Sequence, residues 1–161
     1  MAVDIFLKIA GIDGESKDAQ HTDEMECLSY SFGGHQSGSM HSGTGGGSGK
    51  VSVQDLTITK YVDKGTPNIF ASLCAGSHVD EATLTLRKAG DPPVEYLIVT
   101  MKKVLVSGYS VAGSQGDDRT IENISLNFEE IHLTYTPQAD DGSAEAEIIT
   151  GWNIAANEAA A

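Results

Sequence analysis

Apolar and polar residues alternate along most of the chain with the period of two that is typical of β-strands. β-Branched and aromatic residues dominate these alternating stretches. The pattern predicts strands at residues 4–9, 26–33, 51–62, 82–89, 94–111, 120–135 and 147–154. Gly, Pro and Asp separate them at residues 11–14, 90–93, 113–118 and 137–142, where such residues favour turns. The chain is therefore predicted to be mainly β.

Two of the predicted strands change the parity of their apolar positions. In residues 51–62 the apolar side chains move from odd to even positions after Val53, and in residues 120–135 they move from even to odd after Phe128. Such a change requires a bulge, or a strand that leaves one face to serve another. Residues 96–101 are apolar on both faces, so we expect them to be covered on two sides. Strands that bend in this way predict a single-domain β-barrel of two curved antiparallel sheets.

One short α-helix is predicted at residues 66–75. Thr66 is a suitable N-cap, Pro67 fits the first helical position, and Gly76 can adopt the left-handed conformation after the helix. The apolar residues that fall on one helical face are Ile69, Phe70, Leu73 and Cys74. We expect this face to dock the helix onto a sheet.

Residues 33–50 form a long glycine- and serine-rich loop. Its end resembles a phosphate-binding loop, but Thr44 stands where the motif needs its first glycine and Val51 stands where it needs Ser or Thr. The residues that follow predict a strand, so no helix N-terminus is available to receive an anion. A linker and a loop that becomes ordered on contact remain as interpretations.

The length and composition fit one domain over residues 1–161, with a flexible tail at about residues 155–161. The chain has 10 Lys and Arg against 23 Asp and Glu, a formal net charge of −13. This charge argues against nucleic acid and against an anionic membrane surface as partners. No apolar run approaches a membrane span, and the N-terminal residues lack the basic flank of a signal peptide. We expect Cys27 and Cys74 to be reduced, partly buried thiols.

The sequence offers no arrangement typical of an enzyme. The five histidines lack metal-site spacing, and residues 108–112 depart from the nucleophile-elbow pattern by ending in Ala112. The neighbouring acids, such as Asp117 and Asp118, are typical of a solvated face. We therefore predict a scaffold protein with no catalytic residue, no metal and no cofactor.

An ordered series of segments is similar to the Hcp (haemolysin-coregulated protein) family, the tube subunits of type VI secretion systems. The series spans nearly the whole chain, to about Trp152. Its members are residues 14–18 with His21, residues 36–38, 40–41, 45–47, 49–50 and 60–64, Thr66 with Pro67, and residues 87–90, 95–97, 122–128 and 135–138. The departures are Tyr30 and Phe32, where relatives often have Trp, and Gly65, where Ser is common.

The resemblance implies a phage-tail-tube-like barrel that assembles into homohexameric rings. Rings stack into a tube inside a contractile sheath, a VgrG-type spike caps the tube, and small secreted effectors are carried in the lumen. The protein would be assembled in the cytoplasm and then exported by the type VI system. The resemblance also implies that the loop at residues 33–50 reaches the adjacent ring, through Gln36, Ser37, Met40, His41, Gly45, Gly46, Gly47 and Lys50.

The match to the family makes Ser31 a lumen-facing contact for effectors. Strand alternation places Ser29 on the same face as Ser31, opposite Tyr30 and Phe32, although a bulge would reverse this assignment. A strand that simply turns its serines toward water explains the pattern equally well.

Charge bears on the assembly as well. A hexamer would carry a formal charge of six times −13, or −78, so rings repel one another until salt screens them beyond roughly 8 Å. We therefore expect stable rings whose stacking is favoured by salt, spike or sheath. The alternative is a monomeric, adhesin-like β-barrel binding module that uses the glycine-rich loop. A hydrolase would need a nucleophile cluster that the sequence lacks.

Overall fold

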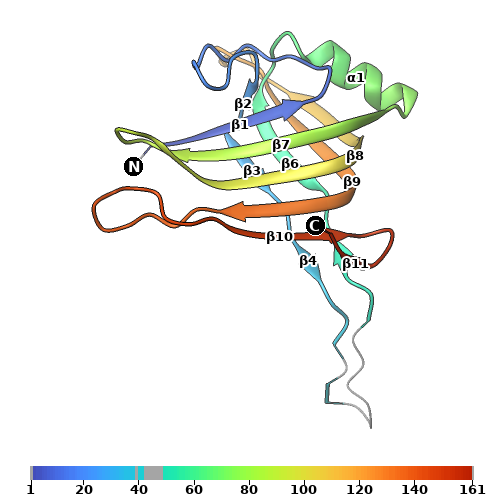
Figure 1. Ribbon diagram of the computed structural model, residues 1–161. Coiled ribbons are helices and arrows are strands. Elements are labelled where there is room, and N and C mark those ends of the chain that lie inside the picture. The colour runs from blue at the N-terminus through green and yellow to red at the C-terminus, as the bar shows by residue number, and fades with distance from the viewer. Residues whose placement is uncertain (1, 39, 42–48, 161) are drawn as a thin grey trace.

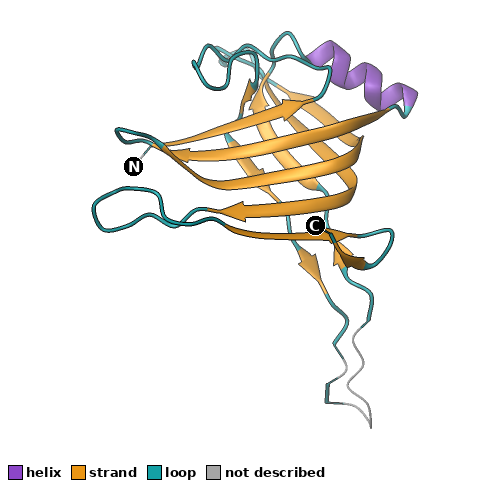
Figure 2. Cartoon of the chain, viewed as in Figure 1, coloured by secondary structure: helices purple, strands orange, loops and turns teal. Residues whose placement is uncertain are grey.

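The computed structural model describes residues 2–38, 40–41 and 49–160 and shows a curled, mainly β fold with one helix (Figures 1 and 2). The strands are β1 (Val3–Ile9), β2 (Met25–Glu26), β3 (Ser29–Ser31), β4 (Gly34–His35), β5 (Ser52–Val53), β6 (Leu56–Tyr61), β7 (His78–Lys88), β8 (Val94–Ala112), β9 (Ile121–Tyr135), β10 (Ile148–Asn153) and β11 (Glu158–Ala159). The helix, α1, spans Thr66–Ala75. The mainly β prediction is confirmed.

Nine of these strands form one antiparallel sheet in the order β11-β10-β9-β8-β7-β1-β2, with β6 also beside β9 and β3 beside β6. The segment that contains β2 and β3 changes partner along its length. The Cys27 N–H donates to the carbonyl of Ile5 (2.9 Å), and the Leu28 N–H donates to the carbonyl of Thr59 (2.7 Å). The sheet therefore curls around the core, but in the described residues its ladder does not close into a complete barrel.

The predicted parity change in residues 120–135 is a shared kink of β8 and β9. Val104 and Phe128 pair on the core side before the kink, Met101 and Ile131 pair on the core side after it, and Lys103 between them has a positive φ of 52°. The neighbour of β9 changes at the same place, because residues 121–126 pair with β6 and residues 130–135 pair with β10. Because of the kink, one edge of β9 pairs with β6 along its first part and with β10 along its last part.

The parity change in residues 51–62 separates two ladders. β5 pairs with β4 in a small two-stranded ribbon that projects from the body, whereas β6 belongs to the large sheet (Figure 1). Residues 96–101 are covered unevenly: Val99 and Met101 are fully buried in the core, but Ile98 on the other face is only half-buried. The face of residues 96–101 that points away from the core is therefore only partly covered by this chain, whereas we expected both faces to be covered.

Helix α1 has the predicted bounds, and Gly76 ends it with a left-handed φ of 63°. Its start differs, because Gly65 is the N-cap and the Thr66 hydroxyl instead donates to Glu122 (2.9 Å). The predicted docking face was half wrong. Ile69 is fully buried and Leu73 packs on the core, whereas Phe70 is 50% exposed.

Cys74 is exposed, which corrects the expectation of two partly buried thiols, while Cys27 is half-buried. Part of the C-terminal stretch expected to be a flexible tail forms β11, which pairs with Trp152 and Asn153 of β10. No helix in the described part of the chain is long and apolar enough to cross a membrane.

Candidate functional site

Strands β3, β6, β9 and β8 carry a continuous polar surface on the side away from the core. Residues directly opposite one another in an antiparallel sheet point to the same face. One row across the four strands is Ser29, Thr59, Asn123 and Ser110, and the next is Ser31, Thr57, Ser125 and Gly108. We call the surface formed by the seven polar residues of these two rows the hydroxyl face. Gly108 lies within it but has no side chain. Ser29 and Ser31 thus lie together at its edge, and both are exposed.

Short cross-strand hydrogen bonds organise the hydroxyl face. The Thr59 hydroxyl donates to Asn123 Oδ1 at 2.7 Å, and the hydroxyls of Thr57 and Ser125 lie 3.2 Å apart. None of the polar residues of the face is ionisable, so in a chain of net charge −13 this surface is neutral. Hydroxyls and amides both donate and accept, so such a surface can bind varied polar partners without a fixed charge pattern.

Asp55 marks one end of the hydroxyl face. Its carboxylate accepts hydrogen bonds from the Ser107 hydroxyl (2.6 Å) and from the Asn127 amide (2.8 Å). On the reverse side of the sheet, Ile58 and Ile124 form a fully buried pair. The face is therefore backed by a packed core, which holds its side chains in fixed rows.

The residues predicted to stack rings lie around the projecting ribbon of β4 and β5. Gly34 pairs with Val53 and His35 with Ser52, and the ribbon points away from the end of the sheet that carries α1 (Figure 1). The described residues of the predicted set are exposed: Gln36, Ser37, Met40, His41 and Lys50. Gly45, Gly46 and Gly47 lie outside the described residues.

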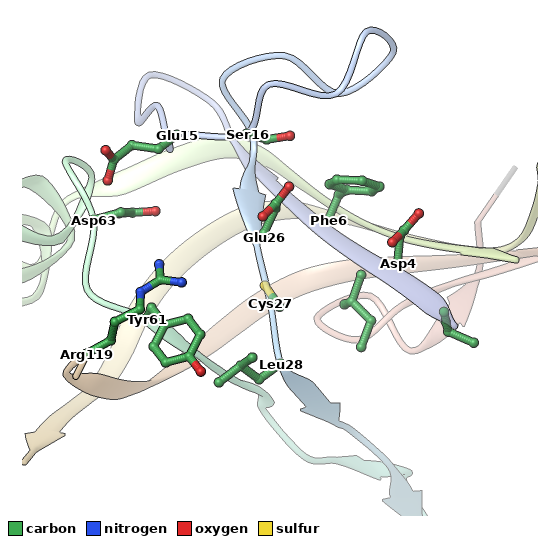
Figure 3. A pocket seen from close by; sticks show the side chains of 12 residues that line it. Asp4, Phe6, Glu15, Ser16, Glu26, Cys27, Leu28, Tyr61, Asp63 and Arg119 are labelled. Carbon is green, nitrogen blue, oxygen red and sulfur yellow. The ribbon is translucent and has the colours of Figure 1, made fainter. Parts of the chain in front are cut away.

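A cavity of about 350 Å³ opens between β1, the segment after β2 and the residues after β6 (Figure 3). Acidic side chains line it, among them Asp4, Glu15 and Glu26. Arg119 stacks on the Tyr61 ring at its side, with the guanidinium carbon 3.8 Å from the ring centroid. Cys27 lines the cavity and also packs against the hydrophobic core.

Burial raises the pKa of the Cys27 thiol to about 12, although the nearby Lys60 charge opposes the shift. A thiol held protonated is a poor nucleophile, so Cys27 is not poised for covalent chemistry. In the part of the chain that the structure describes, no group of three His, Cys, Asp or Glu side chains is placed to hold a metal ion.

Sequence reasoning identified Ser29 and Ser31 but missed the other residues of the hydroxyl face. The signal was available in part, because Thr57 and Thr59 flank Ile58, and Asn123 and Ser125 flank Ile124. Each of these triplets is a buried isoleucine between two outward polar residues. The register that brings the triplets together could not be derived from the sequence.

Comparisons with known proteins agree on one family. The family model described as "Type VI secretion system effector, Hcp" matches residues 6–135. Protein hcp1 of Pseudomonas aeruginosa is 52% identical over 159 residues, which cover 98% of each chain. A solved type six secretion system protein has a TM-score of 0.94 at 28% identity, and Hcp1 from Salmonella typhimurium has 0.82 at 38% identity; each covers 99% of this chain and 100% of its own. The chain therefore belongs to the Hcp family of type VI secretion proteins.

Proposed function

We propose that this protein is the structural subunit of a type VI secretion tube, which forms hexameric rings that stack, carry small effectors in their lumen and are expelled when the sheath contracts. Family membership supports the secretion system as its setting. One observation from the fold supports the ring: the four-stranded layer that carries the hydroxyl face has an unpaired edge at each end.

The two edges belong to β3 and to the last part of β8. In the described residues, no strand pairs with the outer side of β3. β7 last pairs with β8 at His78 and Leu105. Among the described strands, residues 106–112 of β8 therefore pair with β9 alone, while Phe70 of α1 packs on Tyr109. Unpaired strand edges are ready to bind another chain.

The directions of these edges suit a ring. Each neighbouring pair in the layer β3-β6-β9-β8 is antiparallel, so β3 and β8 run in opposite directions. When a second copy is placed beside the first, its β3 therefore continues the sheet antiparallel to β8. A contact between two different surfaces of the same chain closes into a ring when the rotation between copies allows it.

Such a ring would place the hydroxyl faces on one continuous surface. The opposite side of the layer packs on the chain's own core, where Ile58 and Ile124 are fully buried. The body of each subunit therefore lies outside the layer and the hydroxyl face lines the lumen. Ser29 and Ser31, at the edge of that face, would meet the neighbouring subunit and any effector inside. The projecting ribbon would reach the adjacent ring. The other partners of the tube would be the VgrG-type spike and the contractile sheath.

Native mass spectrometry at micromolar concentration tests the ring directly. The expected species is a hexamer of six times 16.9 kDa, about 101 kDa, and negative-stain images should show rings of uniform size. Val111→Lys, at the exposed end of β8, should yield monomers, whereas Ser114→Lys in the following turn should leave hexamers intact. A wild-type protein that is only monomeric would instead support the adhesin-like binding module.

A further inference from the structure

His21 is a nearly buried imidazole held between two carboxylates. It is 7% exposed, its Nδ1 lies 2.7 Å from Glu24 Oε2, and its Nε2 lies 2.6 Å from Glu95 Oε1. The ring stacks on Phe6 with the centroids 4.3 Å apart and the planes 10° from parallel. Both distances are in the range of charge-assisted hydrogen bonds.

The count of donors and acceptors at this site requires an extra proton. A neutral imidazole has one N–H donor and one acceptor nitrogen, and an ionised carboxylate can only accept. With both Glu24 and Glu95 ionised, a neutral His21 would therefore direct a lone pair at one of them. An imidazolium satisfies both contacts, because each of its nitrogens donates.

The surrounding charges favour the imidazolium. Asp18 lies in the same segment, and its carboxylate interacts electrostatically with His21. From β1, Asp4 contributes a negative charge and Lys8 a positive one, while β7 contributes Arg87 and Glu81. Glu95 comes from β8. Five carboxylates face three cations when the imidazole is counted as charged.

His21 fastens a segment that has little regular structure of its own. Residues 13–24 connect β1 to β2, and the contact with Glu95 attaches them to β8. A second attachment is the guanidinium of Arg87, which binds Asp18 and Asp4 at 3.0 Å each. Those hydrogen bonds hold the pKa of Asp18 far below its usual value and that of Arg87 above it. The Arg87 attachment therefore persists at neutral and alkaline pH.

We infer that His21 is a proton-dependent latch, which fastens residues 13–24 to β8 as an imidazolium and releases them when the proton is lost. Loss of the proton leaves Glu95 or Glu24 facing a lone pair in a nearly buried site, where an unmatched acceptor is costly. The segment then remains attached through Arg87 and through Lys64, which contacts Glu15 and Asp23. Its order therefore decreases as the pH rises, while the rest of the sheet is unchanged.

The protonation state is tested first, on the wild-type protein with ¹⁵N-labelled histidine. Both ring nitrogens of His21 should carry protons while residues 13–24 are protected from hydrogen exchange, and the signal of a neutral ring should appear only when that protection is lost. A neutral imidazole in the protected segment would overturn the inference, because the proton would then reside on a carboxyl group or be absent.

Hydrogen exchange tests the release. The amides of His21, Asp23 and Glu24 bond within the segment, and their protection factors should fall by about tenfold once the pH has been raised until the ring is neutral. Glu95→Gln supplies an amide that can donate to a neutral Nε2, so in this variant the protection should change less than about twofold. His21, Glu81 and Glu95 line one cavity of about 490 Å³, but Glu81 makes no hydrogen bond to His21. Glu81→Gln is therefore the matched control, and its protection should depend on pH as in the wild type. An equal pH dependence in Glu95→Gln and wild type would overturn the latch.

Discussion

Lys60 Nζ lies 2.7 Å from Glu122 Oε1, and neither side chain is exposed. The same nitrogen contacts Asp63 Oδ1 at 2.9 Å and donates to the carbonyl of Tyr61 at 2.9 Å. Withdrawal of two charges from water costs several kcal/mol per ion, which attraction offsets only when the remaining donors and acceptors are also satisfied. The ammonium group of Lys60 meets that condition with three partners for its three hydrogens.

Glu122 is equally well satisfied, and through it the pair connects several elements. The Thr66 hydroxyl donates to Glu122 Oε1 at 2.9 Å, and the Tyr109 hydroxyl donates to Oε2 at 2.8 Å. Burial, and then this hydrogen bond, raise the pKa of Tyr109 to about 12. The network thus connects β6, β9 and β8 to the first turn of α1, on the side of the sheet opposite the hydroxyl face.

Removal of the cation should be far more costly than removal of the whole pair. Lys60→Met leaves Glu122 and Asp63 without their cation, and we expect the free energy of unfolding to fall by about 3–5 kcal/mol. The double variant Lys60→Met/Glu122→Leu should recover at least half of that loss, because the desolvated carboxylate is gone as well. Urea unfolding at one fixed protein concentration measures both, because any self-association would be linked to stability.

The matched control for the buried pair is Lys102→Met. Lys102 is 49% exposed and lies 3.7 Å from Glu130, so its loss should cost less than about 1 kcal/mol. Equal losses for Lys60→Met and Lys102→Met would contradict the proposed importance of burial.

Gly65 should resist even the smallest side chain. A Cβ at this position would lie 2.7 Å from the carbonyl oxygen of Asp13, which belongs to the backbone and cannot simply rotate away. We expect Gly65→Ala to lower the free energy of unfolding by about 1–3 kcal/mol. Gly116→Ala, where a Cβ meets nothing within 4 Å, is the control for thermal unfolding. A destabilisation of the same size at both positions would show that close packing is not the cause.

The alternation of apolar and polar residues predicted most strands and the parity changes, because burial of one face of a strand selects apolar residues at every second position. Sequence reasoning missed the buried ion pair, although a signal for it was present: Lys60 is in phase with Ile58, and Glu122 is in phase with Ile124. A charge in a core position signals a buried partner. The identity of that partner depends on the register between β6 and β9, across about sixty residues, and alternation carries no information about register.

The hydroxyl face shows the same limit. The position of Ser31 and its neighbour Ser29 follows from alternation within β3, but the proximity of Thr59 to Asn123 follows from strand pairing. Local capping signals were also incomplete. Thr66 has the residue type of an N-cap, yet its hydroxyl is used by Glu122, because a buried carboxylate is the stronger acceptor.

The two cysteines should differ sharply in reactivity. Cys74 is exposed, whereas the pKa of Cys27 is raised from 9.0 to about 12, which implies roughly a thousandfold less thiolate at pH 8. Iodoacetamide should therefore modify Cys74 readily and leave Cys27 intact in the folded protein. Peptide mass spectrometry measures the two rates, with Cys74→Ser as the control. Comparable rates at both sites would contradict the burial of the Cys27 thiol.

The same shift makes Cys27 a source of pH dependence at alkaline pH. In the unfolded chain the thiol ionises near 9.0, and in the folded chain it stays protonated to about 12. The unfolded state thus loses its proton first, so the stability contributed by this group is complete below pH 9 and is lost as the pH rises toward 12. Cys27→Ser should reduce the fall of the unfolding midpoint between pH 8 and pH 10.5; an unchanged fall would assign it to other groups.

A bulky residue on the hydroxyl face should impair cargo binding without affecting the fold. Ser31→Tyr extends from an exposed position of β3 beside Thr57, so we expect the free energy of unfolding to change by less than about 0.5 kcal/mol. If the face lines the lumen, the variant should still form hexamers but retain at least tenfold less of a co-expressed small type VI effector on gel filtration. Ser77→Tyr, at an exposed position after α1, should retain the effector. Retention by Ser31→Tyr as well would place the effector elsewhere.

The projecting ribbon should control contact between rings. Met40 is 80% exposed although it is apolar, and burial of such a side chain contributes about 1.5–3 kcal/mol when a partner covers it. In the proposed assembly the rings would carry like charge, so that contribution should decide whether they stack. If the protein forms rings, we expect the wild type to form tubes as salt rises from 20 mM to 500 mM. Met40→Glu should remain as single hexamers at the same salt, since it replaces the apolar contact with a further negative charge.

Ala71→Glu provides the comparison for Met40→Glu, because it adds the same charge at an exposed position of α1. Electron microscopy and light scattering across the salt series distinguish the two variants. If Ala71→Glu prevents tubes as completely as Met40→Glu does, net charge opposes stacking. If only Met40→Glu prevents them, the ribbon makes the contact. Tubes from Met40→Glu at 500 mM salt would exclude Met40 from the contact between rings.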